Sequence, residues 1–146
     1  DAVSATSGSI LTSGGTPILA TYSSSNGGFS ERSEYVWSSA LPYLVAAADP
    51  FDSATGNTAA NWSRTFTGAE LGSYLKAAGR GSVGSVTQVV FSGNIGASGR
   101  VDKATVTATG SAGRVSMTGN QFRSAIKAAV PTSRDLLSTR IVITGR

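Results

Sequence analysis

The chain contains neither cysteine nor histidine among its 146 residues, so its fold must rest on an apolar core. Disulfides are excluded, and so is every metal site built on thiolate or imidazole ligands. Ser-His-Asp and Cys-His catalysis are excluded for the same reason. Oxygen ligands alone can bind calcium, but Asp49 and Asp52 do not make a calcium loop. We therefore expect no metal and no other cofactor.

The composition is typical of a β-rich globular domain. Apolar residues make up 40% of the chain and charged residues only 14%, with 18 glycines and many small polar residues. At this length the chain is most simply one domain, spanning residues 1–146. No apolar run approaches membrane-spanning length, so we expect no membrane span. The low charge and the abundant small polar residues favour a secreted domain over a cytosolic helical one.

The net charge of +4 comes from 12 basic and 8 acidic residues. The basic residues are scattered, without a dense run and without interleaved aromatic residues, which disfavours nucleic-acid binding. A mildly basic surface instead suits an anionic polymer such as a cell wall.

Two helices are predicted from their capping boxes, in which two side chains satisfy free N–H groups at the helix start. Thr67 with Glu70 predicts a helix over residues 67–78, and Thr118 with Gln121 predicts one over residues 119–129. Gly79 and Pro131 are natural ends for them.

The remaining patterns predict antiparallel strands and hairpins, so the fold class is α+β. A glycine turn at residues 13–16 separates two apolar segments of a hairpin over residues 9–22. The apolar run from residue 83 to 91, the alternating residues 101–108 and the short segment "GRVSMTG" predict three more strands. We expect the tail "STRIVITG" to be a last strand.

A serine-glycine loop interrupts the first half of the chain and has two interpretations. Asn26-Gly27 is a strong hairpin signal, since both residues tolerate positive φ. Alternatively, the glycines let the backbone approach a ligand closely while the polar side chains bind sugar hydroxyls. Aromatic rings nearby offer stacking faces, although core packing is their ordinary role. The candidate sugar-binding residues are Ser24, Ser25, Asn26, Gly27, Gly28, Trp37, Tyr43 and Trp62.

Cleavage of a glycosidic bond needs a carboxylic acid with a raised pKa. Glu31 and Glu34 are the only carboxylate pair beside the serine-glycine loop, so they are the candidates. The alternative is that both are solvated loop charges.

Five segments in fixed order resemble the sporulation stage II protein D / amidase-enhancer family. They are "AVSATSGSILTSGGTPILATYSSSNGGFSE", "VWSSALPYLVAAADPFD", "NWSRTFTGAEL", "SGRVDKATVTATGSAGRVSMTGNQFRSAI" and "STRIVI". The resemblance implies action on bacterial peptidoglycan, and with it a secreted or cell-wall-associated location in a bacterium. The founding member is a lytic transglycosylase on glycan strands stripped of their peptides. In this family the segment matching the serine-glycine loop looks like part of the glycan-binding groove, which favours the binding interpretation.

The chain departs from the family pattern in one respect. The family's catalytic glutamate lies in a Gly-Glu-Met-like segment that precedes the region matched here, and the zinc-binding Cys and His positions of some members have no counterpart. We therefore expect the C-terminal portion of the family domain and transfer no catalytic residue to this chain. Whether the chain is itself an enzyme stays open.

Three functions remain as alternatives. The first is recognition of peptidoglycan glycan strands as part of a lytic-transglycosylase-type domain, with the acid in a preceding segment. The second is a non-catalytic cell-wall-binding or amidase-enhancing module, and the third is a structural adhesion or assembly domain. The corresponding partners are glycan strands, a cell-wall amidase, a missing N-terminal segment or a second copy of the chain.

Overall fold

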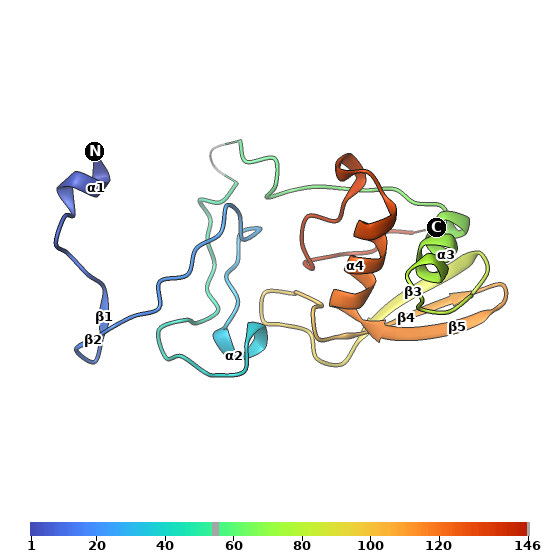
Figure 1. Cartoon of the computed structure of the whole chain (residues 1–146), viewed down its shortest axis with the longest axis horizontal. Coiled ribbons are helices and arrows are strands. Elements are labelled where there is room, and N and C mark those ends of the chain that lie inside the picture. The colour runs from blue at the N-terminus through green and yellow to red at the C-terminus, as the bar shows by residue number, and fades with distance from the viewer. Residues whose placement is uncertain (54–55, 146) are drawn as a thin grey trace.

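The computed structural model describes residues 1–53 and 56–145 and has a mixed α+β fold, which confirms the predicted class. A layered body is formed by the second half of the chain, and a more extended N-terminal half leads away from it (Figure 1). The elements are α1 (Ala2–Ala5), β1 (Thr12–Ser13), β2 (Thr16–Pro17), α2 (Ser33–Val36), α3 (Gly68–Ala77), β3 (Val86–Ser92), β4 (Thr105–Gly110), β5 (Gly113–Thr118), α4 (Gly119–Ala129) and a 3-10 turn (Thr132–Arg134).

The body is a three-stranded antiparallel sheet in the order β3-β4-β5, against which α3 and α4 pack. Phe91 pairs with Val106, and Val106 pairs in turn with Met117, which sets the register of all three strands. Burial of apolar side chains between helices and sheet is the main source of stability. The core cluster consists of Leu75, Val83, Val106, Ala108, Met117, Phe122, Ala125, Ile126 and Leu136.

Both long helices begin at the predicted capping boxes. The Thr67 hydroxyl accepts from the backbone N of Glu70 at 3.1 Å, while the Glu70 carboxylate accepts from the backbone N of Thr67 at 2.7 Å. Thr118 and Gln121 repeat the arrangement at the start of α4. Reciprocal capping satisfies N–H groups that no helical carbonyl can reach, which is why these local signals predicted the helices correctly.

The predicted strand over residues 101–108 starts later than its alternation suggests. The backbone N of Ala104 donates to the carbonyl of Val101 at 3.0 Å, so these residues form a turn and β4 begins at residue 105. Within β4 the alternation is confirmed, because Val106 and Ala108 are fully buried.

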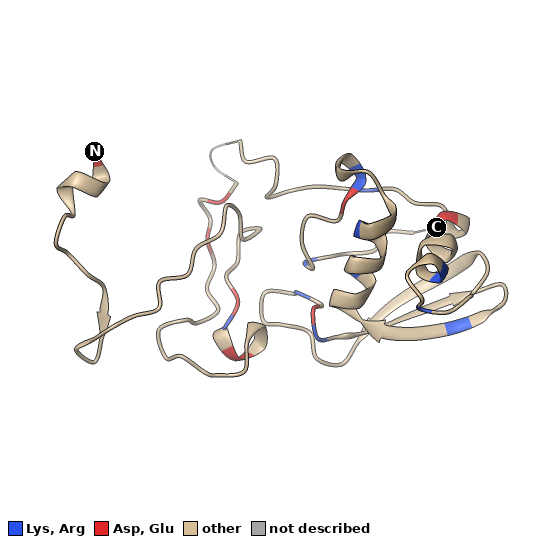
Figure 2. Ribbon diagram, in the orientation of Figure 1, with Lys and Arg blue, Asp and Glu red and all other residues tan. Residues whose placement is uncertain are grey.

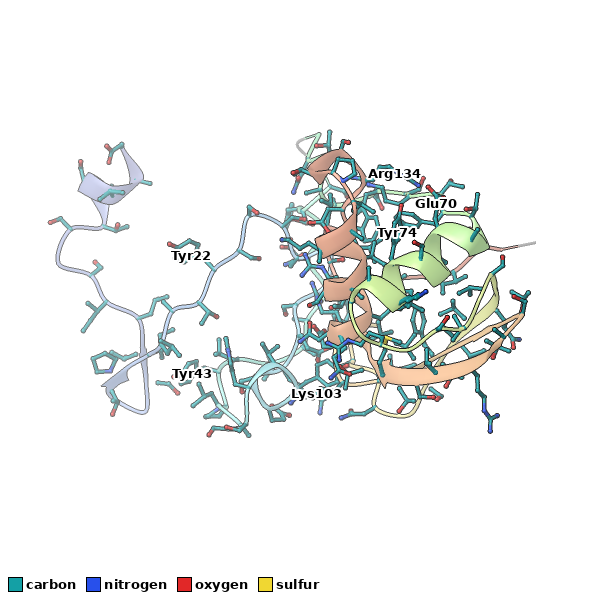
Figure 3. The ribbon with its side chains drawn as sticks, turned by 45° about the vertical axis from the view of Figure 1, so that its right-hand side comes forward. Tyr22, Tyr43, Glu70, Tyr74, Lys103 and Arg134 are labelled. Atoms are coloured by element: carbon teal, nitrogen blue, oxygen red, sulfur yellow. The ribbon has the colours of Figure 1, made fainter. Side chains whose placement is uncertain are left out.

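The first predicted hairpin forms, but with strands of only two residues each. Gly14 and Gly15 make its turn with φ of +56° and +79°, a conformation that favours glycine. Pro17 has no N–H to offer, so it weakens the ladder there. Residues 1–22, which we call the arm, leave Tyr22 98% exposed and projecting away from the body (Figure 3).

The predicted last strand is wrong. Residues 139–145 have no strand conformation. The preceding residues are fixed elsewhere: Arg123 on α4 donates to the carbonyls of Leu136 and Leu137, and the carbonyl of Thr139 accepts from Val101 N. These contacts hold residues 140–145 on the opposite side of a groove from β3. The β-branched residues of this segment therefore have no neighbouring strand with which to form hydrogen bonds. Among the described residues, no helix is long and apolar enough to cross a bilayer.

Candidate functional site

Two aspartates organise the serine-glycine loop, residues 24–28. The Asp52 carboxylate accepts from the Ser25 hydroxyl and the Gly27 backbone N, both at 2.8 Å, and the Asp49 carboxylate accepts from Asn26 Nδ2 at 2.8 Å. The hydrogen bond from Ser25 and those from the backbone hold the pKa of Asp52 below its usual value. Much of the loop's hydrogen-bonding capacity is therefore used inside the protein.

The glycines of this loop, rather than Asn26, adopt the left-handed conformation. Gly27 and Gly28 have φ of +71° and +86°, and no described non-glycine residue has positive φ. The loop is therefore a glycine-glycine turn, and the type I′ turn expected of an Asn-Gly hairpin is absent because it requires positive φ at Asn26.

Two arginines tie the serine-glycine loop to the body from two sides. Arg100 donates through Nη2 to the carbonyl of Asn26 at 2.6 Å and through Nη1 to the carbonyl of Phe29 at 3.0 Å. Arg140 donates through Nη1 to the carbonyl of Gly27. No local pattern indicates either contact, because the partners lie 74 and 113 residues apart in the chain.

A groove of about 860 Å³ opens beside the loop, between residues 60–66, the first half of β3 and residues 140–145. Trp62 is half-buried in its wall and packs on the core, with the Arg64 guanidinium 5.9 Å from its ring centre. Hydroxyl and amide side chains alternate with apolar ones along the walls, and Gly27 and Arg140 lie at the loop side. Of the described residues lining it, two are arginines and none is a carboxylate.

The charge distribution of the chain agrees with this groove. The arm carries Asp1 as its one charged residue, whereas nearly all lysines and arginines lie in the body (Figure 2). An anionic polymer would therefore be attracted to the body rather than to the arm.

The predicted aromatic residues do not gather at one place. Gly27 and Trp62 line the groove together. Trp37 follows α2 and is 48% exposed. The Tyr43 hydroxyl accepts from the backbone N of Leu19 at 3.2 Å, so it contacts the arm (Figure 3). The structure thus places Trp62 in the groove beside the loop, and Trp37 and Tyr43 outside it.

Glu31 is held by three hydrogen-bond donors. Its carboxylate accepts from the backbone N and the hydroxyl of Ser98, at 2.9 and 2.7 Å, and from the backbone N of Arg32 at 2.9 Å. Burial raises the pKa of Glu31, but these hydrogen bonds together outweigh it, so the pKa lies below its usual value. A general acid needs the opposite shift.

Glu34 is a surface residue whose carboxylate lies 3.6 Å from the Arg32 guanidinium, with both side chains about half exposed. Glu31 and Glu34 line a second, shallower cavity of about 400 Å³, together with Tyr35 and Lys103. Neither glutamate lines the groove.

Tyr35 anchors α2 to the body, a role that the sequence did not reveal. Its hydroxyl lies 2.8 Å from the carbonyl of Arg100 and 3.0 Å from that of Asn94, and it accepts from the backbone N of Lys103 at 3.2 Å. Burial raises the pKa of Tyr35, so the hydroxyl stays protonated as a donor. Within residues 1–53 and 56–145, no cluster of carboxylates is arranged to hold a metal ion.

Comparison with known proteins found relatives by sequence alone. No protein-family profile and no solved structure matches the chain significantly. The stage II sporulation protein D of Bacillus subtilis (strain 168) is 39% identical over 89 residues, which are 60% of this chain and 25% of that protein. Its counterpart in Bacillus amyloliquefaciens is 37% identical over the same shares.

The amidase enhancer of Bacillus subtilis (strain 168) is 51% identical over 57 residues, which are 39% of this chain and 8% of that protein. The resemblance to stage II sporulation protein D and amidase enhancer is therefore confirmed over part of the chain. The matches span a quarter or less of the length of these relatives.

Proposed function

We propose that this chain is the glycan-holding part of a bacterial cell-wall protein, and that its groove binds peptidoglycan glycan strands outside the cytoplasm. Two observations support the proposal. The relatives carry the names stage II sporulation protein D and amidase enhancer, and the groove beside the loop has walls chemically suited to a sugar chain.

The groove lining supports sugar binding in three ways. Trp62 offers an apolar ring face of the kind that packs on the C–H face of a pyranose. Thr87 and Gln88 on β3 and Asn61 opposite supply exposed hydroxyl and amide groups for sugar hydroxyls. Arg64 and Arg140 suit an anionic polymer, and among the described lining residues no carboxylate opposes them.

The same lining suggests that this chain binds the glycan strand and does not cleave its glycosidic bonds. Protonating a leaving glycosidic oxygen takes a carboxylic acid, and none lines the described groove. Glu31 lies in the other cavity and its pKa is lowered, so it is ionised at neutral pH. We propose that the acid is supplied by another part of a longer protein, as the greater length of the relatives allows.

A second candidate, an amidase-enhancing role, is favoured by the arm. Five large apolar side chains of the arm are more than half exposed: Val3, Ile10, Leu11, Leu19 and Tyr22. Clustered exposed apolar side chains often mark a protein-binding surface. The 51% identical stretch of the amidase enhancer adds weight to a protein partner. A structural adhesion domain, the third alternative, would bind no sugar at all.

The test is co-sedimentation of the chain with peptide-free glycan strands, comparing Trp62→Ala with Trp37→Ala. The chain has only these two tryptophans, and only Trp62 lines the groove. We expect Trp62→Ala to weaken binding at least about tenfold, or about 1.4 kcal/mol. Trp37→Ala should stay within about twofold of the unmodified chain, a difference of under about 0.5 kcal/mol.

Because Trp62 also packs on the core, Trp62→Phe serves as a second variant that keeps an aromatic ring and most of the packing. Circular dichroism would verify that each variant is folded. No binding by the unmodified chain, or equal losses for the two tryptophans, would contradict the proposed groove.

A further inference from the structure

Arg140 belongs to two features at once. Its Nη1 donates to the carbonyl of Gly27, and its side chain lies 3.6 Å from where a Cβ on Gly27 would be. The same residue lines the groove proposed to bind glycan. Arg140 therefore holds the serine-glycine loop at the point where that loop, through Gly27, meets the groove.

Arg100 provides a natural comparison. It holds the same loop through the carbonyls of Asn26 and Phe29, at 2.6 and 3.0 Å, and the two arginines approach from different parts of the chain. Arg100 does not line the groove. A ligand in the groove can therefore reach Arg140 and leave Arg100 untouched.

The guanidinium of Arg140 has capacity for another partner. None of the ion pairs among the described residues involves Arg140. A guanidinium carries five N–H donors, and it can bind a carboxylate with two parallel hydrogen bonds. A carboxylate in the groove would compete with the Gly27 carbonyl, a neutral and therefore weaker acceptor.

The serine-glycine loop is built to respond to such competition. Gly27 and Gly28 lack side chains that would lock the backbone, while Asp52 and Arg100 would keep holding the loop after Arg140 turned away. Losing one of several restraints shifts a local equilibrium rather than unfolding the segment.

We infer that Arg140 is a positioning residue that couples a carboxylate-bearing sugar in the groove to the conformation of the serine-glycine loop. This inference rests on the proposed function of the groove. It adds that the ligand's carboxylate, and not its sugar ring alone, changes the conformation of the loop.

The test is a titration of the 15N-labelled chain followed by NMR. N-acetylmuramic acid supplies a pyranose ring with a carboxylate, and N-acetylglucosamine supplies a closely related ring without one. The Trp62 indole N–H reports occupancy of the groove, and the backbone N–H of Gly28, which unlike Gly27 does not line the groove, reports the loop. We expect both sugars to shift the Trp62 signal, but only N-acetylmuramic acid to shift the Gly28 signal.

Two variants complete the design. In Arg140→Gln, N-acetylmuramic acid should bind more weakly, and at concentrations that saturate the Trp62 signal Gly28 should no longer respond. In Arg100→Gln, which loosens the loop from its other side, the Gly28 response to N-acetylmuramic acid should persist.

The outcomes separate the two proposals. If Trp62 responds but Gly28 stays still, responds equally to both sugars, or still responds in saturated Arg140→Gln, the coupling is wrong and the groove assignment stands. If Trp62 responds to neither sugar, the proposed function fails, and the inference fails with it.

Discussion

The carboxylate of Glu31 accepts two hydrogen bonds from Ser98, one from its backbone N at 2.9 Å and one from its hydroxyl at 2.7 Å. The two residues are 67 positions apart, so the pair connects the N-terminal half of the chain to the body. Gly96 leaves the space that Glu31 occupies, since a Cβ there would overlap the carboxylate. These contacts suit a structural connection more than an acid in a reaction.

Replacing Glu31 by Gln should lower the free energy of unfolding by about 1 kcal/mol at pH 7, given partial exposure of charged hydrogen bonds. The folded pKa is below the usual 4.5, so the carboxylate stabilises the protein above about pH 4.5. That contribution is lost as pH falls through the lower folded pKa. Urea unfolding at pH 7 and at pH 3 would measure both effects.

Glu34→Gln is the matched control, because the Glu34 carboxylate makes only an exposed ion pair. This replacement should lower the free energy of unfolding by less than about 0.5 kcal/mol. If Glu31→Gln lowers the free energy of unfolding as much at pH 3 as at pH 7, the ionised carboxylate is not the source of the stabilisation.

Gly72 in α3 should not tolerate alanine. Elsewhere in a helix, Gly→Ala stabilises by about 1 kcal/mol. A Cβ on Gly72, however, would overlap the carbonyl of Gly84, so the helix would have to move off the neighbouring loop. We expect a loss of at least about 2 kcal/mol. Chemical denaturation would measure it, with exposed Ser73→Ala as the control expected to be neutral or slightly stabilising.

The Glu70–Arg134 pair should stabilise the body at neutral pH and lose that stabilisation in acid. Arg134 Nη1 donates to the Glu70 carboxylate at 2.8 Å, and this bond, with those from Thr67, lowers the pKa of Glu70 to about 2 (Figure 3). Its stabilisation is therefore fully present above about pH 4.5 and disappears as pH falls toward 2. Glu70→Gln can still cap α3, yet its melting temperature at pH 7 should be lower than that of the unmodified chain.

The difference in melting temperature between Glu70→Gln and the unmodified chain should disappear as the pH approaches 2. Arg134→Gln and the double variant complete a mutant cycle that isolates the pair. Additive losses in that cycle would mean that the ion pair does not contribute.

Deleting residues 1–22 should leave the melting temperature of the body within about 2 °C, since a single exposed hydrogen bond of about 0.5 kcal/mol is at stake. Leu19 N donates that bond to the Tyr43 hydroxyl at 3.2 Å, and most of the arm's side chains are exposed. Calorimetry would measure the change. A fall of more than about 5 °C would show that the arm packs on the body.

Sequence patterns correctly predicted the two long helices, whose starts are determined by residues close together in the chain. The Thr67 and Thr118 capping boxes each lie within four residues, so they identified α3 and α4 with nearly correct bounds. The tail shows where such reasoning ends: residues such as Ile141 and Val142 favour a strand, but residue type cannot reveal whether a sheet edge is within reach.

The candidate site depended on contacts across the whole chain. The serine-glycine loop was identified, and Trp62 does lie near it in the groove. Its aspartate and arginine supports were missed, because Arg140 meets Gly27 across 113 residues and no periodicity encodes such a contact. Trp37 was a stacking candidate together with Trp62, with core packing as its favoured alternative, but it lies outside the groove and is 48% exposed.

The most direct measurement is incubation of the chain with purified peptide-free glycan strands, followed by sedimentation and mass spectrometry of the soluble products. Our account predicts that the chain sediments with the strands and releases no anhydro-disaccharides, because the groove has basic and aromatic walls without an acid. Anhydro products would contradict it and direct attention to Glu31 and Glu34. Failure to sediment would contradict glycan binding itself.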